Sequence, residues 1–96
     1  MRRFVIERDV PRIGTLEREQ LKAMAARSNE VLASLAPNIQ WVESNLADDK
    51  SFCVYLATDE GVIRRHAELS GFPANRITEI ARIIDPTTAD ARARQS

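Results

Sequence analysis

Hydrophobic and polar residues change their spacing several times along the chain, and each change marks a predicted element. Residues 3 to 10 alternate with a period of two, which predicts a strand in which Val5 and Glu7 share one face. From Thr15 onward apolar residues recur at helical spacing as far as Leu35. We expect a helix there, with Thr15 as its N-cap and one apolar side packed on the rest of the protein.

The middle of the chain has the pattern of a β-hairpin. Residues 39 to 46 alternate with a period of two, and residues 51 to 57 are rich in Phe, Val, Tyr and Leu. The polar segment Ala-Asp-Asp-Lys at 47 to 50 is typical of a tight turn between two extended runs. The sequence therefore predicts two antiparallel neighbouring strands.

A second helix and a last strand follow the hairpin. Thr58 or Asp59 is placed to cap a helix whose apolar face includes His66, and Gly71 is placed just past its end. Residues 77 to 84 are β-rich and stop at Asp-Pro, so a fourth strand is predicted there. The predicted order is β-α-β-β-α-β in one domain over residues 1–86, with a flexible tail over residues 87–96.

This order predicts an α+β, ferredoxin-like fold, in which an antiparallel sheet carries both helices on one face. The other face then carries one of two side-chain sets, either Val5, Glu7, Cys53 and Tyr55 or Phe4, Ile6, Phe52, Val54 and Leu56. Both sets are too apolar to face water. We therefore expect a homodimer that packs two sheets face to face as a dimeric α+β barrel.

Composition narrows the possible partners. The 96 residues contain 14 Lys and Arg and 14 Asp and Glu, so the chain lacks the basic excess of nucleic-acid-binding proteins. The apolar run near the N-terminus, residues 4–6, is too short for a signal peptide or a membrane span, and we expect no membrane partner. A single cysteine, Cys53, fits a reducing compartment, and we expect a cytoplasmic protein.

Five blocks of residues resemble, in the same order, a small bacterial domain family of unknown function that includes nickel-responsive, nickel-binding members. The blocks are Gln40-Trp41-Val42-Glu43-Ser44, Asp48-Asp49-Lys50, Cys53-Val54-Tyr55, His66-Ala67 with Gly71-Phe72-Pro73-Ala74-Asn75-Arg76, and Ile84-Asp85-Pro86-Thr87-Thr88. The resemblance covers roughly residues 3 to 88. It implies a ferredoxin-like fold, a dimer and nickel as the leading candidate ion.

Three residues are candidate metal ligands: His66, Cys53 and Glu7. Ni(II) takes imidazole, carboxylate and in some sites thiolate, but no closely spaced ligand motif is present, so a site would have to be assembled from distant elements. Each residue also has a purely structural interpretation: a hydrogen-bonded helix histidine, a small buried hydrophobe, and a carboxylate paired with Arg82 or with the partner subunit. The three converge only if Glu7 and Cys53 lie beneath the helices.

Trp41 and Tyr55 are candidate ligand-pocket walls or interface anchors, because both are large aromatics with a polar tip. The first hypothesis is a non-enzymatic, nickel-binding or nickel-responsive homodimer without an organic cofactor. The alternative is a dimeric-barrel enzyme or carrier, of oxygenase, isomerase or cyclase type, that holds a small apolar ligand between sheet and helices. No nucleophile-base pair, phosphate loop or cofactor fingerprint is visible in the sequence.

Overall fold

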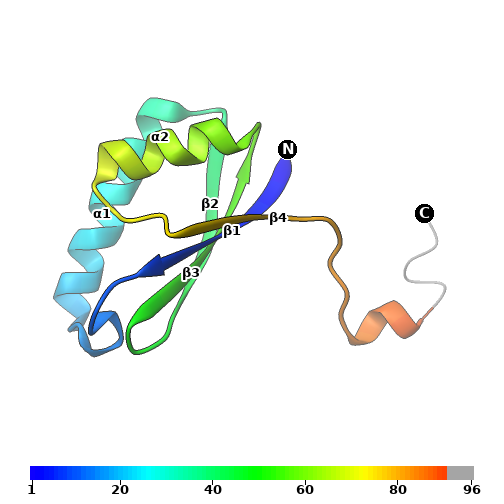
Figure 1. Cartoon of the computed structure of the whole chain (residues 1–96), viewed down its shortest axis with the longest axis horizontal. Coiled ribbons are helices and arrows are strands. Elements are labelled where there is room, and N and C mark those ends of the chain that lie inside the picture. The colour runs from blue at the N-terminus through cyan, green and yellow to red at the C-terminus, as the bar shows by residue number, and fades with distance from the viewer. Residues whose placement is uncertain (91–96) are drawn as a thin grey trace.

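A computed structural model describes residues 1–90 and places two helices on the same side of a four-stranded sheet (Figure 1). The elements, in chain order, are β1 (Arg2–Asp9), the 3-10 helix η1 (Ile13–Thr15), α1 (Arg18–Leu35), β2 (Ile39–Leu46), β3 (Lys50–Ala57), α2 (Glu60–Ser70), β4 (Arg76–Ile80) and the 3-10 helix η2 (Pro86–Ala89). The strand order in the sheet is β2-β3-β1-β4, and all neighbours are antiparallel. The predicted α+β, ferredoxin-like fold is confirmed.

Several predicted boundaries hold because their local chemistry decides them. Asp59 is the N-cap of α2, and its Oδ1 accepts a hydrogen bond of 3.0 Å from the Val62 backbone N–H. Gly71 ends that helix with a φ of 79°, a left-handed conformation that favours glycine. The hairpin of β2 and β3 also forms as predicted, with a register shift between Trp41 and Glu43.

Other boundaries differ from the prediction. Helix α1 begins at Arg18, where Glu17 and Gln20 form a reciprocal capping box, so Thr15 is not its N-cap. Thr15 is instead the last residue of η1. Its backbone N–H and its hydroxyl both donate hydrogen bonds to the Arg12 carbonyl. The last strand, predicted over residues 77 to 84, spans only Arg76–Ile80, and its last pair joins Ile80 to Arg3 near the beginning of β1.

The register decides which residues share a face, and it corrects the grouping predicted from the sequence. The opposed pairs of β1 and β3 include Phe4 with Tyr55, Val5 with Val54, Ile6 with Cys53, and Glu7 with Phe52. Residues directly opposed in an antiparallel pair point to the same face. Cys53 and Tyr55 therefore lie beneath the helices and Glu7 lies on the uncovered side, which we call the open face. The prediction that these three residues share a face is wrong.

The hydrophobic core lies between the sheet and the helices. Its buried members are Phe4, Ile6, Ile39, Cys53, Tyr55, Ala57 and Ile63. Helix α2 contributes the fully buried Ile63 and His66, whereas the only buried side chain of α1 is Ser28. Helix α1 therefore covers its part of the sheet less closely than α2 does.

The loop between β1 and α1 is fastened to the hairpin turn. Val10 and Gly14 donate backbone hydrogen bonds to the carbonyls of Asp49 and Asp48, each 3.0 Å long. A Cβ added at Gly14 would lie 2.5 Å from the Ala47 carbonyl oxygen, so glycine is required for this close approach. The contact fixes the end of the layer between α1 and the sheet that lies at the hairpin turn, where Ile13 is buried.

The chain leaves the sheet after β4 and extends away from the rest of the molecule (Figure 1). Ile83 and Ile84 are exposed there, Ile84 by 79%. The radius of gyration of 15.0 Å exceeds the value of about 12 Å expected for a compact domain of this length. Residues 87 to 89 of the predicted flexible tail belong to η2, and residues 91–96 lie outside the described part.

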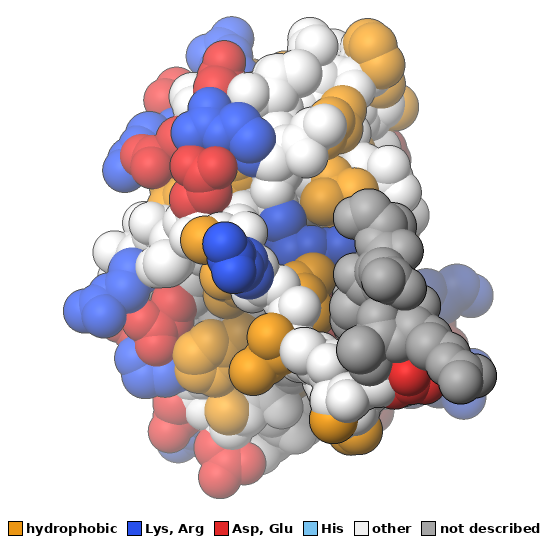
Figure 2. Space-filling view, turned by 90° about the vertical axis from the view of Figure 1, so that its right-hand side faces the viewer, with side chains coloured by type: hydrophobic (Ala, Val, Ile, Leu, Met, Phe, Trp, Pro, Cys, Tyr) orange, Lys and Arg blue, Asp and Glu red, His pale blue; other side chains and the backbone are white. Residues whose placement is uncertain are grey.

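Figure 2 shows the side of the molecule toward which this segment extends, with exposed hydrophobic patches between charged groups. Neither helix within residues 1–90 combines the length and the hydropathy that a bilayer-spanning helix needs.

Candidate functional site

A cavity of about 580 Å³ lies between α1 and the helix-covered face of the sheet, and we call it the α1 cavity. Its size follows from the small residues that α1 turns toward the sheet, Ala25 and Ser28, which leave space above β1 and β3. Its apolar lining consists of Val10, Ile13, Leu21, Met24, Ala25, Trp41, Leu46, Phe72 and Pro73, and its more polar lining of Arg8, Ser28, Ser44, Ser51, Cys53 and Tyr55, with Gly71 at the loop.

Arg8 is the charged residue of this lining. Its side chain is only 3% exposed, and its Nη1 donates a hydrogen bond of 2.6 Å to the Pro73 carbonyl. Its Nη2 lies 3.4 Å from the Tyr55 hydroxyl, and its guanidinium carbon lies 5.9 Å from the centre of the Phe72 ring. Within residues 1–90 no carboxylate forms an ion pair with Arg8, and no acidic residue lines the cavity.

The two predicted pocket-wall residues both line the α1 cavity. Trp41 is half-buried, and its indole N–H donates a hydrogen bond of 3.0 Å to the Ser44 hydroxyl. Tyr55 is 2% exposed, and burial raises the pKa of its phenol while the positive charge of Arg8 opposes that rise. Tyr55 therefore presents a neutral hydroxyl to the cavity near neutral pH.

His66 lies behind this wall and is completely buried. Its Nε2 is 3.1 Å from the Ser28 hydroxyl, and its ring packs against Tyr55 with 5.4 Å between the ring centres. Its Nδ1 is the only buried side-chain nitrogen or oxygen of the described residues without a hydrogen-bond partner. Burial, and secondarily the charge of Arg8, lower the pKa of His66 from 6.5 to about 4, so the imidazole is neutral at physiological pH.

Cys53 lies on β3 between Ser51 and Tyr55 and is 6% exposed. Its Sγ is 3.6 Å from the Ser51 hydroxyl, and the residue lines the cavity. Cys53 is therefore a small buried hydrophobe that also forms part of the cavity wall.

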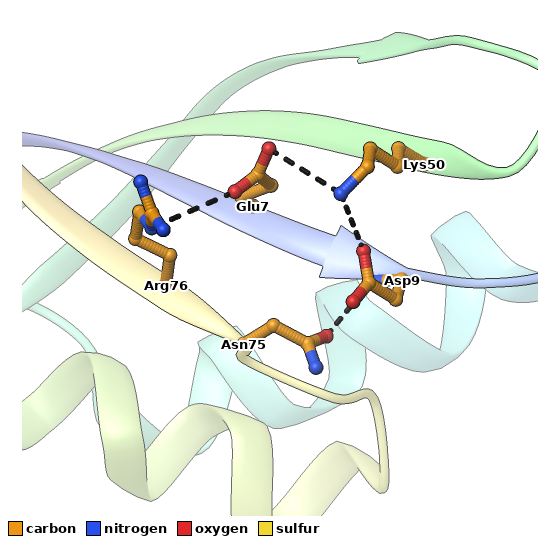
Figure 3. A network of polar contacts seen from close by, with 5 residues as sticks. All are labelled: Glu7, Asp9, Lys50, Asn75 and Arg76. Atoms are coloured by element: carbon orange, nitrogen blue, oxygen red, sulfur yellow. Dashed lines mark hydrogen bonds and ion pairs between the residues drawn. The ribbon is translucent and has the colours of Figure 1, made fainter.

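Glu7 belongs to a polar network on the open face, not to the α1 cavity (Figure 3). Its carboxylate oxygens lie 3.6 Å from Lys50 Nζ and 3.8 Å from Arg76 Nε. Lys50 also contacts Asp9 at 2.8 Å, and this contact raises the pKa of the lysine. The predicted pairing of Glu7 with Arg82 is not formed, because Arg82 lies beyond the end of β4.

The three predicted metal ligands are therefore not brought together within the described chain. His66 and Cys53 lie on the helix side of the sheet and Glu7 on the other side. Residues 1–90 contain no group of three His, Cys, Asp or Glu side chains spaced to hold a metal ion. The buried cation of Arg8 beside His66 further disfavours a second cation there. The side chains of residues 1–90 do not fit a nickel centre at His66.

Arg8 is the residue that sequence reasoning missed. A charged residue near the end of a strand is ordinarily expected to face solvent. The signal was nevertheless present, since Arg8 has the same parity as the buried Phe4 and Ile6 and therefore points to the same face.

Three comparisons place the chain among known proteins. A family model described as "Nickel responsive protein SCO4226-like" matches residues 4–80. No curated protein matches the sequence. Among solved structures, the "Crystal structure analysis of SCO4226 from Streptomyces coelicolor A3(2)" is similar, with a TM-score of 0.70 and 15% sequence identity over 85% of this chain and 99% of that chain. At this identity the structural likeness supports the fold.

Proposed function

The chain belongs to the SCO4226-like family of nickel-responsive proteins, and we propose that it acts as a small-molecule-binding protein whose ligand occupies the α1 cavity. The observation that carries the proposal is the cavity itself. Its volume of about 580 Å³ falls within the range of roughly 300–1,000 Å³ that is typical of small-molecule sites. Its lining of apolar side chains with a few convergent polar groups is also typical of such sites.

A binding role fits the chemistry of the lining better than catalysis does. The cavity offers the fixed positive charge of Arg8 and the neutral hydroxyl of Tyr55, which hold and orient a ligand. It has no acidic side chain among the described residues that would pair with them as a general acid or base. The sequence left an enzyme or a carrier as the alternative function, and the present proposal corresponds to the carrier.

The family description is the only support for nickel in this proposal. The family's description concerns a response to nickel, and His66, Cys53 and Glu7 do not form one centre in a subunit. We therefore assign none of these three side chains to a metal in the proposed function. The ligand of the α1 cavity is proposed to be organic.

We also propose that the functional form is a homodimer joined through the open face. The centre of this face is apolar, with Val5, Phe52, Val54 and Leu56, and its charged residues have both signs: Arg3, Glu7, Glu43 and Arg76. A two-fold axis can set such a face against its own copy, with apolar side chains in contact and opposite charges paired. Face-to-face packing would leave the α1 cavity on the outer, helix side of each subunit.

A cavity-filling substitution tests the binding role. Titration with the neutral fluorescent probe N-phenyl-1-naphthylamine should show saturable emission enhancement with the wild-type protein. Ala25→Phe should abolish it, because Ala25 lines the cavity, whereas Ala26→Phe should not, because Ala26 is exposed on the same helix. Equal binding by both variants, with both folded by circular dichroism, would contradict the proposed site.

A further inference from the structure

Arg8 carries a buried positive charge that the described protein does not neutralise. Only 3% of the residue is exposed, and arginine keeps its charge in proteins. A buried charge without a counterion is strongly destabilising, so such groups are ordinarily found in ion pairs. The nearby groups that compensate Arg8 are a carbonyl, a hydroxyl and an aromatic ring, none of which carries a negative charge at neutral pH.

Arg8 lies in the wall of the α1 cavity, so a ligand in the cavity can reach its charge. Its contacts to Pro73 and Tyr55 use one N–H on each terminal nitrogen, and a guanidinium has five N–H donors. The residue lines the α1 cavity, so the guanidinium is the polar end of an otherwise mostly apolar space. The Tyr55 hydroxyl, at 3.4 Å, lies beside it and can donate to the same acceptor.

From this arrangement we propose that the α1 cavity selects an apolar molecule that bears one carboxylate, and that Arg8 binds this carboxylate. The inference rests on the proposed function and names the class of its ligand. One buried cation balances one negative charge, which favours a monoanion over a phosphate dianion. Leu21, Met24 and Leu46 supply the apolar walls for the remainder of the molecule.

The test compares three ten-carbon probes that differ only in the head group: decanoate, decanol and decylamine. Trp41 is the only tryptophan of the chain and lines the cavity, so its emission reports binding directly, at concentrations below the micelle threshold of the two ionic probes and below the solubility limit of decanol. At pH 7.5 decanoate should bind at least about tenfold more tightly than decanol, as a charge-assisted hydrogen bond predicts. Decylamine should bind more weakly than either.

Two variants test whether Arg8 causes the preference for decanoate over decanol. Arg8→Met, which keeps an apolar stem of similar length, should remove the preference for decanoate over decanol while binding of decanol remains. Arg8→Lys, which keeps the charge, should retain the preference in reduced form. If Arg8→Met does not fold, the wild-type series together with Arg8→Lys decides the question.

The outcomes separate this inference from the proposed function. Decanol binding equal to or tighter than decanoate binding would overturn the carboxylate assignment while the cavity remains a binding site. A decanoate preference that survives in Arg8→Met would overturn the role of Arg8. Failure of N-phenyl-1-naphthylamine and all three probes to bind would contradict the proposed function itself.

Discussion

Replacing His66 by glutamine should change how the stability of the protein depends on pH. The imidazole packs against Ser28 from α1, Tyr55 from β3 and the charge of Arg8 from β1, and these surroundings favour its neutral form. Its pKa is about 4 in the folded protein and 6.5 in its ordinary state. Because the unfolded chain binds the proton more readily, acidification through this interval favours unfolding.

The size of the effect follows from the two pKa values. The interval between 6.5 and about 4 corresponds to a loss of about 3 kcal/mol once the pH falls below both values. Between pH 7.5 and pH 5.5 the free energy of unfolding should fall by about 1.4 kcal/mol. Below pH 5.5, most of the remaining loss occurs before the pH reaches 4. This stability is fully present above pH 6.5 and absent below about pH 4.

Urea denaturation followed by Trp41 emission measures the free energy of unfolding at each pH. The comparison is the change between pH 7.5 and pH 5.5 in the wild type and in His66→Gln, so that contributions common to both proteins cancel. The wild type should lose about 1.4 kcal/mol more than the variant. Equal pH dependence in the two proteins would refute the assignment of a buried, neutral imidazole at this position.

Three further predictions concern the loop at Gly14, the proposed dimer and the response to nickel. Gly14→Ala should destabilise the protein by more than about 1 kcal/mol in urea denaturation, because its Cβ would clash with the hairpin turn, whereas Gly61→Ala, which meets only a side chain at 3.1 Å, should cost much less. Phe52→Glu should convert the proposed dimer to a monomer in size-exclusion chromatography with light scattering. Leu69→Glu, at a residue of similar exposure on α2, should leave the mass unchanged. A wild-type monomer would rule out the homodimer. His66→Asn should leave the calorimetric response of the untagged protein to Ni(II) unchanged, and loss of a saturable signal in this variant would show that the buried imidazole binds the metal.

The fold was predictable because each element has its own local signal. The alternation in β1, the polar turn of the hairpin and the cap residues Asp59 and Gly71 are all short-range features that the structure confirms. The start of α1 was misplaced because Thr15 resembles an N-cap as well as Glu17 does, and only the η1 turn distinguishes them.

The site was less predictable because it depends on the relative register of strands. Parity within β1 separates Val5 and Glu7 from Phe4 and Ile6, but parity alone does not relate β1 to β3 across the intervening elements. The structure opposes Ile6 to Cys53, so Glu7 falls on the other face. The cavity likewise depends on how far α1 stands from the sheet, which the helical pattern of the sequence does not specify.

Intermolecular nuclear Overhauser effects with bound N-phenyl-1-naphthylamine locate the ligand on the protein. The probe should give cross-peaks to the methyl groups of Leu21, Met24 and Ala25, because these side chains line the α1 cavity. Cross-peaks confined to Val5, Val54 and other residues of the open face would contradict binding in the α1 cavity.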